Sequence, residues 1–205
     1  DNMLYIRSDV DDTYSHSAEV KSRSEDASKP VRTTSVKIIK PNDKYTNNQI
    51  VVDIPNVRKP VPLFILMRAL GILSDKQIIQ YCLLDLEKNK NYMNLFIPSI
   101  HDASTIFTQE AALQYISVFT KRKSLSYVYD ILMNYFIPHI GETNFRDKAI
   151  YIGTIVFKLL KVFNKEEAAT DRDNFKFKRV ELPGSLCYDL FKEYYNTMQE
   201  ELFKK

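Results

Sequence analysis

Glycine is scarce in this chain: the 205 residues include only four, and the four stand far apart. The phosphate-binding loops of Rossmann and P-loop proteins need several clustered glycines, because their backbone must approach the phosphate closely. The sequence therefore excludes nucleotide binding through either of these loops.

Cysteine is also rare, and Cys82 and Cys187 form no CxxC pair. A structural zinc site needs about four ligands with paired spacing, so zinc fingers and zinc ribbons are excluded. Two separated cysteines do not make a disulfide framework, which favours a location inside the cell.

Long apolar runs are missing as well. No stretch reaches the roughly 18 consecutive apolar residues that a membrane helix needs, and no secretory signal pattern is present. We therefore expect no membrane partner. The first residue is Asp1 and not Met, and we interpret this start as that of a fragment of a longer chain.

The charge is nearly balanced overall but unevenly distributed. The formal net charge is +3 and the sequence pI is about 8.7. Residues 1–29 carry seven acidic and four basic side chains, so the remainder of the chain holds a net charge of +6. This mild electropositive bias neither demands nor excludes a nucleic-acid partner.

Residues 1–57 have the pattern of strands and turns. Ser35–Ile39 and Ile50–Ile54 are short, β-branched runs of the kind that form strands. Ala18–Pro30 is polar, and we interpret it as partly a surface loop.

From Pro60 onward the pattern is helical. Ser74–Gln77 has the S-x-x-Q spacing of a capping box, and Thr108 can cap a later helix. Asn144–Phe163 is apolar on nearly all sides through its middle, which predicts a central buried helix. Gly153 costs that helix about 1 kcal/mol relative to Ala, which indicates the close approach of a neighbouring element.

Prolines mark the limits of several helices. Pro62 can occupy a first helical position, and Pro98 ends a short apolar piece. Pro138 stops one helix and Pro183 starts the last one. Because strands come first and helices follow without alternation, the sequence predicts an α+β fold.

The stretch Thr170–Gly184 concentrates charge, and two interpretations of it stay open. Asp171, Asp173 and Glu181 are spaced carboxylates of the kind that a hard divalent cation binds, although basic side chains stand among them. In the second interpretation the charges form a structural network of ion pairs that orients the segment. The members of that network are Asp171, Arg172, Asp173, Lys178 and Arg179.

Lys121, Arg122 and Lys123 follow one another at the predicted end of a helix. The helix dipole favours cations there, so a solvated helix cap is one interpretation. The other is contact with phosphate groups, which makes these three the candidate DNA-facing residues.

Two further kinds of polar residue have structural interpretations. The three histidines, His16, His101 and His139, are scattered, and we expect each to be a surface or capping residue. Arg68 is the only charged residue in the apolar stretch Pro62–Gly71, so we expect its stem to pack and its head to be paired.

Several stretches, in the same order, resemble the lobe region of the second-largest (β-type) subunit of multisubunit DNA-directed RNA polymerases of eukaryotic, archaeal or viral type. The most specific are VPLFILMRALGILSDKQII (Val61–Ile79) and DRDNFKFKRVELPGSLCYDLF (Asp171–Phe191). The other matching stretches are Ser17–Asp26, Ala111–Ser124, Asp130–Gly141 and Lys148–Leu160.

Some positions depart from the family's usual pattern in the charged stretch. They are Thr170, Asn174, Phe177 and Pro183. This divergence, together with the abundance of Tyr, Phe, Ile, Lys and Asn that an A+T-rich genome gives, favours a large DNA virus as the source.

The resemblance implies a structural module that has no catalytic residue, cofactor or metal of its own. In this family the lobe lines one side of the DNA cleft and docks the largest subunit, other subunits and general transcription factors, with weak contact to downstream DNA. The Mg²⁺ and Zn²⁺ of the full enzyme are expected elsewhere. The implied segments are a strand-rich part (1–57), a helical core (58–169), and a charged exit with a helix returning towards the protrusion domain (170–205).

Two alternatives stand beside this interpretation. The first is a small independent nucleic-acid-binding protein, motivated by the basic remainder of the chain and by Lys121–Lys123. The second is a metal-dependent nuclease that uses Asp171, Asp173 and Glu181. The expected location is intracellular: virion and host cytoplasm for a viral source, or the nucleus for a cellular eukaryotic one.

Overall fold

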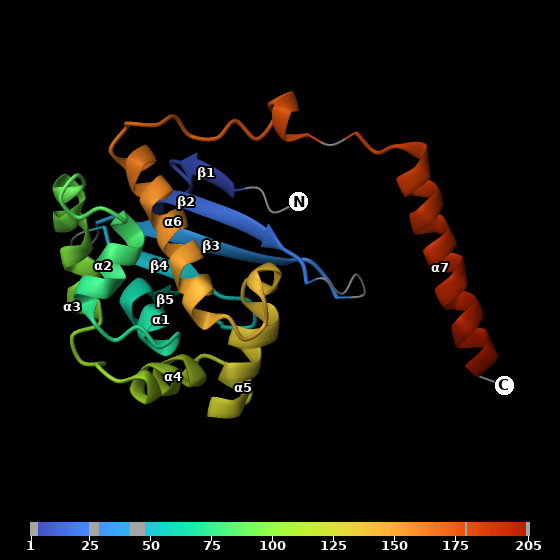
Figure 1. Cartoon of the computed structure of the whole chain (residues 1–205), viewed down its shortest axis with the longest axis horizontal. Helices are drawn as coiled ribbons and strands as arrows, with labels where there is room; N and C mark the ends of the chain where they lie inside the picture. Colours follow the sequence, from blue (N-terminus) through green and yellow to red (C-terminus); the bar gives the residue numbers. More distant parts are fainter. Residues whose placement is uncertain (1–3, 25–28, 42–47, 179, 204–205) are drawn as a thin grey trace. The chain divides into compact units, whose positions relative to one another are not determined.

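The computed structural model describes residues 4–24, 29–41, 48–178 and 180–203. The chain divides into two compact units, Asp1–Thr170 and Asp171–Lys205. The first unit contains a sheet followed by helices, and the second contains one long helix (Figure 1).

A five-stranded antiparallel sheet begins the first unit, and its strands pair in the order in which they occur along the chain. Antiparallel neighbours can be joined by short turns, so this sheet needs no crossover helix. The strands are β1 (Leu4–Ser8), β2 (Tyr14–Ser22), β3 (Arg32–Ile39), β4 (Ile50–Asp53) and β5 (Val61–Pro62).

The strands expected at Ser35–Ile39 and Ile50–Ile54 are confirmed as β3 and β4. Val36 pairs with Val52 across these strands, and both side chains are buried. Branched side chains pack well on a pleated surface, which is why these runs form the middle of the sheet.

β2 extends into Ala18–Pro30, so only the part of this stretch after Ser22 can be the surface loop that the sequence indicates. Ala18, Val20 and Ser22 are buried and alternate with more exposed residues. This alternation is weak in the sequence because two of the three inward side chains are small and one is polar. Residues 25–28 lie outside the described part of the chain.

Six α-helices follow in the first unit. α6 lies across the sheet, where it contacts β1, β2 and β3 and also packs against α2 (Figure 1). The α+β prediction is confirmed. The helices are α1 (Leu63–Ala69), α2 (Asp75–Leu83), α3 (Ile97–Asp102), α4 (Gln109–Val118), α5 (Leu125–Asp130) and α6 (Phe145–Phe163).

α6 is the central buried helix that the sequence predicts at Asn144–Phe163. Ile152 and Val156 are fully buried. Gly153 lies against the backbone of α2, where an added Cβ would come within 2.5 Å of the Tyr81 carbonyl oxygen. The close approach expected for this glycine is confirmed.

Several helices start at the residues that the sequence predicts, but not all of the predicted capping contacts form. The Thr108 hydroxyl accepts a hydrogen bond from Ala111 N at 3.2 Å, as a cap should. Ser74 occupies the N-cap position of α2, but its side chain makes no capping bond. Pro98 starts α3 instead of ending a helix, because a first-turn proline gives up no intrahelical bond. Pro62 precedes α1 as the last residue of β5.

The second unit contains α7 (Pro183–Phe203), which starts at the proline that the sequence predicts. None of the described side chains of α7 is buried. Its large apolar residues are therefore uncovered: Leu186, Leu190, Phe191, Tyr194, Met198 and Leu202. None of the helices in the described ranges combines the length and the apolar character that crossing a membrane requires.

Candidate functional site

The charged segment after Thr170 is ordered by local contacts. Asp171 Oδ1 accepts a hydrogen bond from Asp173 N at 3.0 Å. Lys178 Nζ lies 3.3 Å from Asp173 Oδ1, and both side chains are exposed. An exposed pair of this kind contributes at most about 1 kcal/mol. Arg179 lies outside the described residues, so the wider charge network stays a prediction.

The metal interpretation of this segment receives no support from the geometry. Among the residues that the structure describes, no group of three or more His, Cys, Asp or Glu side chains is placed to hold a metal ion. Asp171, Asp173 and Glu181 are therefore not brought together.

The basic loop Lys121–Lys123 connects α4 to α5 and is exposed. The Arg122 guanidinium lies over the Tyr127 ring, 5.2 Å from its centroid. Lys123 N donates to the Thr120 hydroxyl at 3.3 Å, which tightens the turn. Within the described ranges no carboxylate forms an ion pair with any of the three cations, so they are available to an anion from outside.

Arg68 is buried, with 1% of its surface exposed. Its guanidinium donates to Ala103 O at 2.7 Å and to Ile106 O, and it forms an ion pair with Asp75. The expected packed stem and paired head are confirmed. Arg68 joins α1, the start of α2 and the segment after α3, so its role is structural.

His139, expected to be a surface or capping residue, is half-buried in the last turn of the short helix Pro138–Ile140. Its Nδ1 lies 2.7 Å from the Ser22 hydroxyl oxygen, and its ring meets the edge of Tyr151. Burial lowers the pKa of His139, and the nearby cation Lys148 lowers it further. No carboxylate within the described ranges completes a catalytic triad with this Ser–His pair, and the Ser22 side chain is buried.

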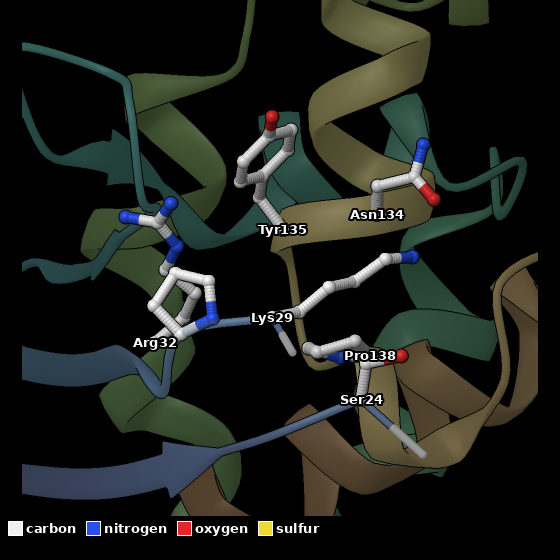
Figure 2. A pocket seen from close by; sticks show the side chains of 7 residues that line it. Ser24, Lys29, Arg32, Asn134, Tyr135 and Pro138 are labelled. Atoms are coloured by element: carbon white, nitrogen blue, oxygen red, sulfur yellow. The ribbon is translucent and has the colours of Figure 1, made fainter. Parts of the chain in front are cut away.

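A hollow of about 280 Å³ opens between the strand end near Ser24 and the π-helical turn Ile131–Tyr135 (Figure 2). We call it the Arg32 groove. Its lining residues are Ser24, Lys29, Pro30, Arg32, Asn134, Tyr135 and Pro138.

A second hollow of about 500 Å³ shares Ser24, Lys29 and Pro138 with the Arg32 groove. Its other walls include Glu142 and Asn144, near the start of α6. The two hollows therefore adjoin, and we call them together the continuous depression: Arg32 lines the first, Glu142 lines the second, and Lys29 lines both.

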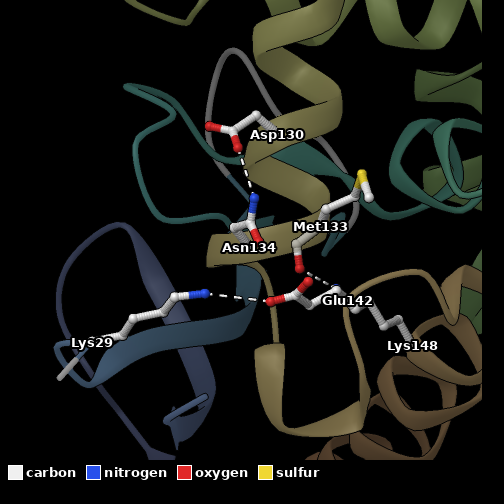
Figure 3. A network of polar contacts seen from close by, with 6 residues as sticks. All are labelled: Lys29, Asp130, Met133, Asn134, Glu142 and Lys148. Atoms are coloured by element: carbon white, nitrogen blue, oxygen red, sulfur yellow. Dashed lines mark hydrogen bonds and ion pairs between the residues drawn. The ribbon is translucent and has the colours of Figure 1, made fainter. Parts of the chain in front are cut away.

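Polar contacts fix the walls of this depression (Figure 3). Asn134 Nδ2 donates to Asp130 Oδ1 at 2.7 Å. Lys29 Nζ lies 3.3 Å from Glu142 Oε1. Lys148 Nζ, which is fully buried, donates to Met133 O at 2.9 Å and also to Leu132 O. Two carbonyls within the π-helical turn are thus held by a buried cation.

Burial lowers the pKa of Lys148 from 10.5 to about 8, although nearby Glu142 raises it slightly. Between these two pH values the unfolded chain holds a proton that the folded chain has released, so the free energy of unfolding rises with pH. We expect Lys148→Met to remove this rise, which is on the order of 3 kcal/mol.

The measurement is urea unfolding of both proteins from pH 7.5 to pH 10.5, followed by circular dichroism. Cys82 and Tyr92, whose pKa values burial raises to about 12, oppose the trend in both proteins and cancel in the difference. Parallel stability curves for the two proteins would contradict the assignment to Lys148.

The Arg32 groove has no signature in the sequence. In the sequence Lys29 lies in the polar stretch Ala18–Pro30, Arg32 follows that stretch, and Tyr135 lies in a distant helical segment. The fold brings them together from segments that are distant along the chain, so no spacing rule could find them.

Comparison with known proteins identifies the family. Residues 23–181 match the family described as RNA polymerase Rpb2, domain 2. DNA-directed RNA polymerase II subunit RPB2 of Encephalitozoon cuniculi is 34% identical over 194 residues, covering 91% of this chain and 16% of that protein. DNA-directed RNA polymerase II subunit 2 of Arabidopsis thaliana is 30% identical over 200 residues, covering 92% and 17%.

An archaeal relative is similar over a shorter range. DNA-directed RNA polymerase subunit Rpo2 of Saccharolobus shibatae is 32% identical over 158 residues, covering 74% of this chain and 14% of that protein. This chain therefore spans 14–17% of the length of these three relatives. Because the family match covers most of its residues, the chain belongs to the family of RNA polymerase Rpb2, domain 2.

Proposed function

We propose that this chain is the lobe of a second-largest subunit of a DNA-directed RNA polymerase, lining the DNA cleft during DNA-templated RNA synthesis. The observation that carries the proposal is the family match over residues 23–181. The lobe acts as a structural and docking module of a nucleotidyltransferase and carries no catalytic residue, cofactor or metal ion itself.

The partners follow from this role. The largest subunit and other polymerase subunits hold the lobe in place, and general transcription factors dock on its outer surface. The enzyme's compartment sets the location: the nucleus of a eukaryote, or the virion and host cytoplasm if the source is a large DNA virus.

The three segments 1–57, 58–169 and 170–205 have distinct roles in this proposal. The first two form the strand-rich part and the helical core of the lobe. The third leads the chain towards the neighbouring protrusion domain. The uncovered apolar face of α7 supports this role, because a helix with such a face gains its stability from packing against another surface.

Lys121, Arg122 and Lys123 face downstream DNA in this proposal. Their exposure and lack of carboxylate partners within the described ranges support that role. Each cation that contacts a phosphate of duplex DNA adds about 0.9 to the salt slope of binding. We expect their replacement by alanine in the polymerase that contains this domain to weaken retention of downstream duplex. RNA synthesis on a scaffold without downstream duplex stays unchanged.

The matched control replaces Lys76, Lys88 and Lys90, which are equally exposed, with alanine and changes the net charge by the same amount. Retention is measured by the salt concentration at which transcribing complexes release a labelled scaffold. Equal loss of synthesis on both scaffolds would contradict a purely positioning role. Tight, steeply salt-dependent DNA binding by this chain alone would favour the alternative of an independent nucleic-acid-binding protein.

A further inference from the structure

We infer that the Arg32 groove binds an acidic peptide segment of a partner protein. A carboxylate of the peptide lies on the Arg32 guanidinium, and an apolar neighbour packs against Tyr135 and Pro138. This inference rests on the part of the proposed function that gives the domain protein partners, and it names the chemistry of one such contact.

Arg32 is the first reason. Its guanidinium lies over the Tyr135 ring, 5.2 Å from the ring centroid, and Figure 2 shows both side chains among those that line the hollow. Among the described residues no carboxylate pairs with it. Stacking on an aromatic face leaves the edge donors of a guanidinium free, and that planar fork matches a carboxylate with two hydrogen bonds.

The Lys29–Glu142 pair is the second reason. The two side chains are 42% and 52% exposed, and their charged atoms are 3.3 Å apart. Such an exposed pair is weak. A carboxylate already occupies the position next to Lys29 within the continuous depression, so the carboxylate of a ligand can replace Glu142 there. An acidic peptide therefore has to break the Lys29–Glu142 ion pair when it binds.

The wall that carries Tyr135 and Asn134 is fixed before any ligand arrives. Both residues belong to a π-helical turn, a rare geometry that occurs often at functional sites. Lys148 holds two of its carbonyls, and Asp130 holds the Asn134 side chain. A preformed wall reduces the ordering that binding would otherwise require.

The shape of the site favours a peptide over nucleic acid. Two prolines and a tyrosine line a concave site whose cations, among the residues that the structure describes, are Lys29 and Arg32. Duplex DNA presents its phosphates on a convex surface and binds arrays of exposed cations. An extended peptide alternates its side chains, so an acidic and an apolar residue can reach different parts of the continuous depression.

The probe is a fluorescein-labelled peptide of alternating aspartate and phenylalanine, and its control has asparagine in place of every aspartate. Fluorescence anisotropy with the full 205-residue chain should show saturable binding of the acidic peptide alone. We expect Arg32→Ala to weaken binding by about tenfold, as the loss of a charge-assisted hydrogen bond should. Arg32→Gln, which keeps the stem, should weaken it similarly.

Glu142→Gln provides the sharper test. It removes the Lys29–Glu142 ion pair before the peptide arrives, so peptide binding should become about threefold stronger, a change typical of one exposed ion pair. Glu87→Gln removes the same charge at an exposed position outside the groove and should leave binding unchanged. Thermal melting of each variant shows that the fold is retained. Equal binding of the two peptides, or equal effects of the two glutamate substitutions, would overturn the inference.

Competition separates the remaining possibilities. Unlabelled acidic peptide should displace the probe, whereas a short DNA duplex at the same negative charge should not. Displacement by DNA that is lost in Arg32→Ala would make the groove a phosphate site and overturn the inference. That outcome would not change the result of the polymerase assays on Lys121–Lys123. The peptide inference can therefore be wrong while the proposed lobe function is right.

Discussion

Replacing Arg68 with methionine should lower the free energy of unfolding of the first unit by about 2–3 kcal/mol. Methionine keeps the apolar stem, so packing changes little. The loss comes chiefly from Ile106 O, which is partly buried and would lose its donor, whereas the buried Ala103 O keeps the hydrogen bond that Ile106 N donates at 3.1 Å. An unpaired buried acceptor bears the full cost of its removal from water.

Asp75→Asn is the matched control for Arg68→Met. Asp75 forms the third contact of Arg68, but its side chain is 38% exposed, so water can replace much of the interaction. We expect a loss of about 1 kcal/mol or less. Both variants are compared by urea unfolding at pH 7. Equal losses would show that the ion pair, and not the two carbonyl contacts, makes Arg68 important.

Gly153→Ala should destabilise the same unit by about 2–3 kcal/mol, the usual cost of forcing an atom into a packed interior. In an open helix this substitution stabilises by about 1 kcal/mol, so the expected sign is reversed. The added Cβ would lie 2.5 Å from Tyr81 O and 3.1 Å from Cys82 N. Both atoms belong to the backbone of α2 and cannot rotate away, so the two helices must separate.

Lys158→Ala is the control for Gly153→Ala, because Lys158 is exposed on the same helix. It tests alanine in α6 without a steric conflict, and we expect a change within about 0.5 kcal/mol. The measurement is the melting temperature of each variant relative to the unsubstituted chain. A rise in melting temperature for Gly153→Ala would show that α2 does not approach α6 as closely as described.

The sequence predicted those parts of the fold in which periodicity and chemistry agree. Ile152 marks the middle of α6 because apolar residues surround it on nearly all sides. Val36 and Val52 mark β3 and β4 because branched residues cluster there. β2 escaped prediction because its inward residues are small or polar. Pro98 was misread because proline starts some helices and ends others.

The candidate site was less accessible to prediction than the fold. The run Lys121–Lys123 could be named because its members are neighbours in sequence, although its role stays a prediction. The sequence predicted that the charged head of Arg68 is paired, but it could not name the partner. The acceptors are backbone carbonyls that follow α3, far from Arg68 along the chain. The Arg32 groove depends on a contact between the sheet and a π-helical turn, and no local pattern encodes such a contact.

The last residue of the first unit lies beside its first strand. Thr170 N donates to Ile6 O at 2.9 Å, so the chain leaves this unit beside the strand with which it begins. A unit whose two ends meet can be carried as an insertion in a larger protein without disturbing its host. A pull on the segment after Thr170 would therefore load β1 before it reaches the strands farther along the sheet.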